Sequence, residues 1–218
     1  MNYKDNFEYV SHKVKNESDL RKKIINTLNN PEEKNLIGKS KESGFITGKA
    51  KVYDLEYIVK LFGLGQTSLV LKIRDNIDNT LCEKLKSEAA LYLDLYDAFL
   101  EKKSFKEEFE KYVKNNKSPI PFALLVTSGE KHGLLMNNVA FNAKIYDPQD
   151  LGTGKYWSKI ENILKLRDVC GDLFNDEVNP HIIEKAGMYQ AVFLDLDEYI
   201  DKASDKNKRF IESKHVKL

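Results

Sequence analysis

The stretch from Ser68 to Phe99 constrains the fold most strongly, because it predicts a strand followed directly by a helix. Residues 69–73 read Leu-Val-Leu-Lys-Ile, a short apolar strand that Lys72 interrupts. The helix carries one apolar stripe at steps of three, four and seven residues: Leu81, Leu85, Tyr92, Leu95 and Phe99. We therefore expect the helix to pack its stripe on a sheet that contains the strand.

Glu88 falls within this apolar stripe, about 20° from its mean direction at about 100° per residue. A buried carboxylate stays ionised at low cost only when a cation meets it. Lys72 lies on the preceding strand, so we expect Lys72 and Glu88 to form an ion pair. The alternatives are an ordinary strand lysine and a glutamate that leans out at the edge of the stripe.

The composition is that of a globular protein, with 218 residues, 41% of them hydrophobic and 32% charged. A net charge of +1 gives no reason to expect a nucleic-acid or membrane surface. The two cysteines, Cys82 and Cys170, suit a reducing compartment, and the first ten residues lack an apolar signal region. We expect a cytoplasmic or at least intracellular protein of one domain or two small lobes.

The remaining chain predicts helices mixed with hairpins. Residues 1–16 are polar and are expected to be frayed or packed as an arm. Helices are expected at 18–28, within 101–117 and at 156–168, and a hairpin is expected from strands 122–126 and 133–137. This pattern favours the α+β class.

A second informative stretch runs from Gly171 to Asp197. It reads as an acidic loop beginning Gly-Asp-Leu at 171–173, then Asn179, a short strand, a turn, and an apolar strand that ends in Asp195-Leu-Asp197. Acidic and amide side chains at such strand ends can hold a metal or accept a proton. The alternatives are an acidic turn and a strand capped by surface acids.

Together the two stretches resemble the protein-kinase-like superfamily. In that fold a strand lysine holds the nucleotide phosphates, and a glutamate on the next helix holds the lysine. The resemblance implies a two-lobed α+β fold: residues 36–138 as an antiparallel N-lobe sheet, residues 139–218 as a truncated, small helical C-lobe, and residues 1–35 as an N-terminal helical extension. The missing A-P-E motif and the Asp-Leu-Asp in place of D-F-G indicate a reduced or degenerate member.

The resemblance also implies catalytic and metal-binding residues. Lys72 would neutralise phosphate, Glu88 would fix Lys72, and Asp172 would accept the hydroxyl proton of the acceptor. Asn179 and Asp195 would hold Mg²⁺. The separation of Asp172 and Asn179 exceeds that of D-x-x-x-x-N by two residues, so this loop needs an insertion.

The cofactor implied by the resemblance is ATP. Gly44 and Gly48 would bring the backbone close to the phosphates, although their spacing differs from G-x-G-x-x-G. Met136 would lead into the hinge that holds adenine. The implied function is that of an ATP-dependent phosphotransferase with an unidentified protein or small-molecule acceptor.

Two other classes stay open. One is a pseudokinase or interaction protein without catalysis, which would fold but bind no nucleotide. The other is a cysteine protease or acyltransferase, because His132, Asp147 and Cys170 stand in the order seen in ubiquitin-like-modifier proteases and related acetyltransferases. A histidine oriented by an acid can activate a thiol. Alternatively, His132 is a hairpin residue and Cys170 a small buried group.

Overall fold

The computed structural model describes residues 2–39, 50–74, 81–146, 160, 163–194 and 196–218. This part of the chain is a mixed α+β structure with mainly antiparallel sheets, which confirms the expected class. Its helices are α1 (Asp5–Asn16), α2 (Ser18–Asn29), η1 (Glu33–Asn35), α3 (Leu81–Glu101), α4 (Lys106–Lys114), α6 (Ile163–Phe174), η2 (Leu196–Lys202) and α7 (Asp205–Lys214).

The larger of the two sheets contains the strand predicted from the sequence. Its spatial order is β1 (Leu36–Lys39), β2 (Ala50–Leu61), β3 (Gly65–Arg74), β5 (Lys131–Asn137), β4 (Ala123–Ser128) and β9 (Val216–Lys217). Its neighbouring strands are antiparallel except β4 and β9, which run parallel. Most of β3 is buried on both faces, which explains its unbroken apolar run. The predicted strand and the β4–β5 hairpin are confirmed.

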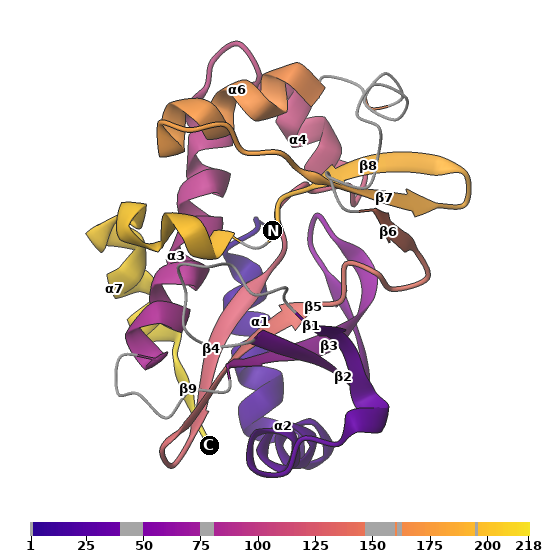
Figure 1. Ribbon diagram of the computed structural model, residues 1–218, viewed down its shortest axis with the longest axis vertical. Coiled ribbons are helices and arrows are strands. Elements are labelled where there is room, and N and C mark those ends of the chain that lie inside the picture. The colour runs from indigo at the N-terminus through magenta and orange to yellow at the C-terminus, as the bar shows by residue number, and fades with distance from the viewer. Residues whose placement is uncertain (1, 40–49, 75–80, 147–159, 161–162, 195) are drawn as a thin grey trace.

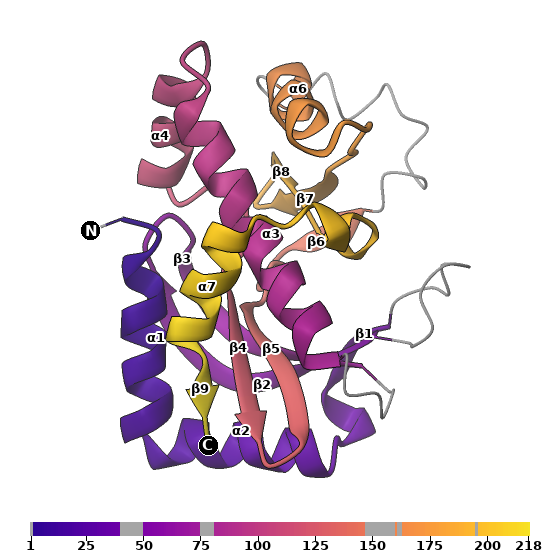
Figure 2. The ribbon, with the colours of Figure 1, turned by 90° about the vertical axis from the view of Figure 1, so that its left-hand side faces the viewer.

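Helix α3 is the central helix of the structure, and its prediction is confirmed. It packs on β4 and β5 and also contacts α4, α6, α7 and η2. Figure 2 shows α3 crossing the molecule between the sheet and these elements. Every side chain from residue 87 to residue 96 is buried, so the helix is enclosed well beyond its predicted stripe.

Of the two alternatives expected for the first 16 residues, a frayed arm or a packed one, the structure shows the packed one, and most of these residues form helix α1. Phe7, Val10 and Val14 are at most 1% exposed and share one face of this helix. Asn6 fixes the helix to the end of β2: its Nδ2 donates to the carbonyl of Phe62 at 3.1 Å, and its Oδ1 accepts from the Phe62 N–H at 2.9 Å. The polar residues between these positions hid the amphipathic pattern.

Helix α2 packs on the same sheet through β2, β3 and β5. A Cβ atom added to Gly133 of β5 would lie 2.9 Å from Leu71 Cδ1 and 3.0 Å from Leu28 Cδ2. Glycine at this position therefore allows α2 to approach the sheet closely. Both α1 and α2 contribute to the same hydrophobic core as the sheet.

The smaller sheet consists of β6 (Lys144–Tyr146), β7 (His181–Lys185) and β8 (Met188–Val192), all antiparallel. Figure 1 shows it beside α6 and α4 in the upper half, above the larger sheet. Helix α7 and strand β9 follow it in sequence but return to the larger sheet, where β9 pairs with β4. The segment 139–218 is therefore divided between both sheets, and it is not purely helical.

Helix α6 corrects one expectation. The predicted helix at 156–168 lies partly outside the described residues, and the observed helix continues to Phe174. Gly171, Asp172 and Leu173 therefore belong to a helix and not to an acidic loop. Leu166, Val169 and Cys170 are buried on its inner face with Phe174, so packing extends the helix through the glycine.

Candidate functional site

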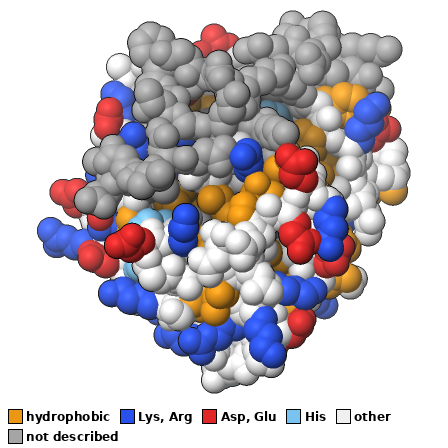
Figure 3. All heavy atoms as spheres, turned by 60° about the horizontal axis from the view of Figure 1, so that its bottom comes forward, with side chains coloured by type: hydrophobic (Ala, Val, Ile, Leu, Met, Phe, Trp, Pro, Cys, Tyr) orange, Lys and Arg blue, Asp and Glu red, His pale blue; other side chains and the backbone are white. Residues whose placement is uncertain are grey.

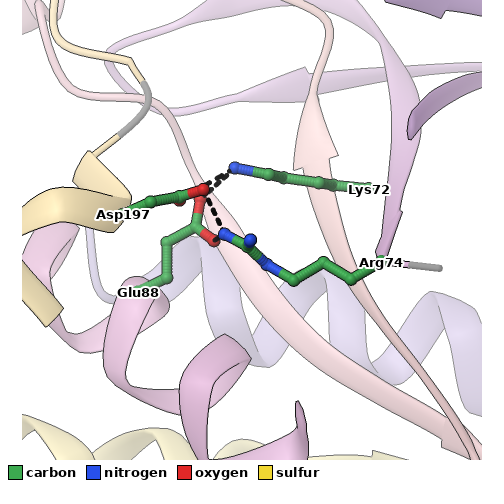
Figure 4. Close-up of polar contacts among 4 residues, drawn as sticks. All are labelled: Lys72, Arg74, Glu88 and Asp197. Atoms are coloured by element: carbon green, nitrogen blue, oxygen red, sulfur yellow. Dashed lines mark hydrogen bonds and ion pairs between the residues drawn. The ribbon is translucent and has the colours of Figure 1, made fainter. Parts of the chain in front are cut away.

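Four charged side chains from β3, α3 and η2 meet in one buried cluster, which we call the ion-pair cluster: Lys72, Arg74, Glu88 and Asp197 (Figure 4). The Lys72 Nζ lies 2.5 Å from Glu88 Oε1 and 3.1 Å from Asp197 Oδ1. The Arg74 Nη2 lies 3.4 Å from Glu88 Oε2 and also contacts Asp197 Oδ2. Each cation thus bridges both carboxylates, and the four formal charges sum to zero.

The contact between Lys72 and Glu88 confirms the ion pair expected from the sequence. The side chain of Glu88 is 0% exposed and that of Lys72 is 5% exposed. The apolar stripe of α3 brings Glu88 against the sheet, where only a cation can compensate its buried charge.

Arg74 and Asp197 are the two members of the cluster that our sequence predictions missed. Side chains two positions apart on a strand point to the same face, so the position of Lys72 already implied that of Arg74. Asp197 was a weaker signal, because the metal role was assigned to Asp195. Asp195 lies outside the described residues. Asp197 is the second residue of η2, and its side chain contacts both cations.

The two carboxylates of the cluster have opposite pKa shifts. Burial raises the pKa of Glu88 to about 7, and the nearby charges of Lys72 and Arg74 only partly oppose this effect. Burial also acts to raise the pKa of Asp197, but Lys72 and Arg74 outweigh it and bring that pKa to about 2. At neutral pH Asp197 is therefore the firmly ionised anion of the cluster.

We expect the stability of the wild type relative to Glu88→Gln to fall as pH rises. The folded-state pKa of Glu88, about 7, lies above its ordinary value of 4.5, so between these values the folded state retains a proton that the unfolded state has lost. At about 1.36 kcal/mol per pKa unit, the wild type should lose roughly 3 kcal/mol of unfolding free energy relative to the variant. Urea unfolding of both proteins from about pH 5 to about pH 8 measures this loss. A difference that does not change with pH would contradict it.

The predicted catalytic base, Asp172, does not join the cluster. It lies on α6 with a side chain that is 66% exposed, and it pairs with Lys102 just beyond α3. Because Asp172 is in a helix and held at the surface, its predicted position in a catalytic loop is wrong. Asn179 is exposed on the segment before β7.

Of the residues predicted to bind the cofactor, the structure describes Met136 but not Gly44 and Gly48. Met136 is only 6% exposed in β5, where it pairs with Val70 of β3 and Ala123 of β4. Met136 comes just before the connection between the two sheets and its side chain is buried, and its predicted place at a hinge that holds adenine stays a prediction.

The structure does not bring His132 and Cys170 together. His132 lies in β5 beside the β4–β5 turn, at the lower end of the molecule, and Cys170 lies in α6 at the upper end (Figures 1 and 2). Cys170 is 0% exposed, and burial raises the pKa of its thiol well above the ordinary value. A buried neutral thiol is a poor nucleophile. Asp147 lies outside the described residues.

Two cavities of about 470 and 350 Å³ lie along β8, and no residue of the ion-pair cluster lines either one. The smaller cavity is lined by Gly65–Thr67 at the start of β3, whereas Lys72 and Arg74 lie at the other end of this strand. Five residues of strand, or about 17 Å, separate Thr67 from Lys72. These cavities are therefore not part of the cluster.

The surface in Figure 3 shows basic and acidic side chains interspersed, with hydrophobic side chains between them. Among the described residues no group of three or more His, Cys, Asp or Glu side chains is arranged to hold a metal ion. None of the described helices is both long and apolar enough to cross a membrane.

We compared the chain with protein-family models, with curated proteins and with solved structures, and none of the three comparisons found a match.

Proposed function

We propose that this protein has a kinase-like fold and binds a nucleoside triphosphate at the ion-pair cluster. The observation that carries the proposal is the buried pair between Lys72 on the central strand β3 and Glu88 on the helix that follows it. In kinase-like proteins such a pair presents the lysine to the nucleotide phosphates. A lysine and an arginine that converge at one buried position would provide charge for a polyanion.

The order of the elements supports the same proposal. Strand β3 is followed by α3, the β4–β5 hairpin joins the same sheet through β5, and the chain then passes to the smaller sheet and α6. In this proposal the larger sheet with α3 is the N-lobe, and the smaller sheet with α6 is the C-lobe. Helices α1 and α2 cover the N-lobe sheet, and α7 with β9 returns to it.

The magnesium site implied by the resemblance fits the described residues poorly. Carboxylate oxygens are the ligands that Mg²⁺ prefers, but both oxygens of Asp197 already accept from cations. Asn179 is exposed on its loop, and Asp195 lies outside the described residues. Magnesium on Asn179 and Asp195 remains a prediction, and we derive no step through it.

A second candidate is a kinase-like protein that binds nucleotide without transferring phosphate. The observation that favours it is the position of Asp172, which is held at the surface of α6 by Lys102. The described residues then leave the acceptor hydroxyl without the base that the resemblance implied. Incubation with γ-labelled ATP distinguishes the two candidates, because only the phosphotransferase moves label to protein, small molecule or water.

Nucleotide binding is expected to raise the melting temperature of the wild type. At an ATP concentration of 100 Kd the folded state gains about 2.7 kcal/mol. For a chain of this size, that gain corresponds to roughly 5–10 °C. Differential scanning fluorimetry with ATP, in the presence and absence of Mg²⁺, measures the shift. Lys72→Met should abolish it, because the substitution removes a cation at the phosphate position.

Lys60→Met is the matched control, since Lys60 lies on the neighbouring strand β2 with an exposed side chain. This variant should keep the full shift. A wild type that melts cooperatively but shows no shift with ATP, with or without Mg²⁺, would overturn the proposed nucleotide site. An unchanged shift in Lys72→Met would place the nucleotide elsewhere.

A further inference from the structure

Asp197 is the most accessible member of the ion-pair cluster. Its side chain is 14% exposed, against 5% for Lys72, 4% for Arg74 and 0% for Glu88. Glu88 is anchored in the middle of the enclosed helix α3, whereas Asp197 stands near the start of η2, a short 3₁₀ helix. Of the two anions, Asp197 is therefore the one that can leave the cluster with less disruption of the core.

Arg74 retains hydrogen-bonding capacity inside the cluster. Its Nη2 serves both carboxylates, but its Nε is buried and has no hydrogen-bond partner among the described residues. Buried donors in folded proteins are nearly always paired, so an unpaired guanidinium N–H indicates a place for an acceptor. A guanidinium can bind two oxygens of a phosphate through two adjacent nitrogens, whereas the two carboxylate oxygens that contact Arg74 both lie on Nη2.

We propose that Asp197 occupies the position of a ligand phosphate, and that a phosphate group exchanges with it to bind Lys72 and Arg74 without a divalent cation. The inference rests on the proposed function and specifies the ligand as a phosphoanhydride polyanion, such as a nucleoside triphosphate or pyrophosphate. When the phosphate enters, the two cations keep an anion between them, and Asp197 moves toward solvent. Arg74 then supplies the positive charge that a metal ion would otherwise bring to the phosphate.

Substitution of Asp197 should have opposite effects in the proposed site and in a metal-dependent site. If Asp197 competes with phosphate, Asp197→Asn removes the competitor and should tighten ATP binding in EDTA about tenfold or more. If Asp197 is instead a metal ligand, the same variant should weaken Mg²⁺-dependent binding. Arg74→Met should weaken binding in EDTA by about ten- to a hundredfold, the usual effect of losing one charge-assisted hydrogen bond.

Titration calorimetry with ATP, pyrophosphate and adenosine, in EDTA and in Mg²⁺, tests these statements on the wild type and the variants. Asp201→Asn is the matched control, because Asp201 lies on the same helix η2 but is exposed. We expect ATP and pyrophosphate to bind in EDTA, adenosine not to bind, and the control to behave as the wild type. Circular dichroism melts confirm that each variant is folded at the temperature of the titration.

Two results would overturn the inference while leaving the proposed function intact: binding only with Mg²⁺, or binding in EDTA that Asp197→Asn does not tighten. Absence of ATP binding under both conditions, in the wild type and in Asp197→Asn, would overturn both. If Asp197→Asn does not fold, the Arg74 Nε–H resonance of the wild type provides the test. It should shift on addition of pyrophosphate in EDTA, and an unchanged resonance contradicts the inference.

Discussion

Replacing Glu88 with alanine is expected to lower the free energy of unfolding at neutral pH by about 3–5 kcal/mol. The substitution removes one of the two carboxylates that both Lys72 and Arg74 contact, Glu88 and Asp197, and leaves the two cations buried. The lost hydrogen bonds lie in an interior that water does not reach, so their loss is costly whether Glu88 is ionised or protonated. The substitution also leaves a cavity in the part of α3 where every side chain, from residue 87 to residue 96, is buried. Urea unfolding monitored by circular dichroism measures the loss.

The matched control for this prediction is Glu83→Ala. Glu83 lies on the same helix and also pairs with a lysine, Lys86, but its side chain is 65% exposed. Exposed pairs of this kind contribute little, so the control should lose less than about 1 kcal/mol. If Glu88→Ala cost no more than the control, the ion-pair cluster would not be a structural centre of this protein.

Replacing Phe7 with alanine is expected to lower the free energy of unfolding by about 3–5 kcal/mol, the usual range for deleting a buried phenyl group. Phe7 is 1% exposed and joins three parts of the chain. Its ring centroid lies 4.9 Å from that of Phe122, just before β4, and 5.3 Å from that of Phe210 in α7. At about 2–4 °C per kcal/mol, the melting temperature should fall by roughly 6–20 °C.

Tyr9→Ala is the control, because Tyr9 is an aromatic residue of the same helix that is 38% exposed. Its ring contacts Lys13 Nζ at 5.2 Å from the centroid, and an exposed contact of this kind contributes about 0.5–1 kcal/mol. The unfolding of Phe7→Ala should remain a single transition, since α1 shares its core with the sheet. A separate early transition of α1, with the sheet unaffected, would make residues 1–35 a detachable extension instead.

The strongest sequence signals were local ones, and the structure confirms them. The strand with Lys72, the helix with Glu88 and the β4–β5 hairpin were readable because apolar periodicity and turn residues act over short distances. The pairing of Lys72 with Glu88 followed from the same pattern, because a carboxylate inside an apolar stripe needs a nearby cation. The α+β class followed from the mixture of these elements.

Other features depended on contacts between distant segments. The sequence of helix α1 is mostly polar. Its three buried apolar residues are nevertheless enough to hold it on the protein, because the end of β2 and α7 contact it. Gly171 and Asp172 read as a loop, but the packing of Cys170 and Phe174 holds them in α6. The free energy gained by burying such side chains exceeds the cost of a residue with low helix propensity, which is rarely more than about 1 kcal/mol per residue.

The sequence by itself determined the central strand, the central helix and one ion pair, because each follows from the nearest-neighbour chemistry of a short segment. Only the tertiary structure decided that Arg74 and Asp197 complete a neutral cluster with that pair. Asp197 lies 125 residues after Lys72 in the sequence. A periodic pattern within one short segment cannot predict a contact between residues so far apart in the chain. The physical reason is that electrostatic partners are selected by where the folded backbone places them, whereas periodicity records only which face of an element is buried.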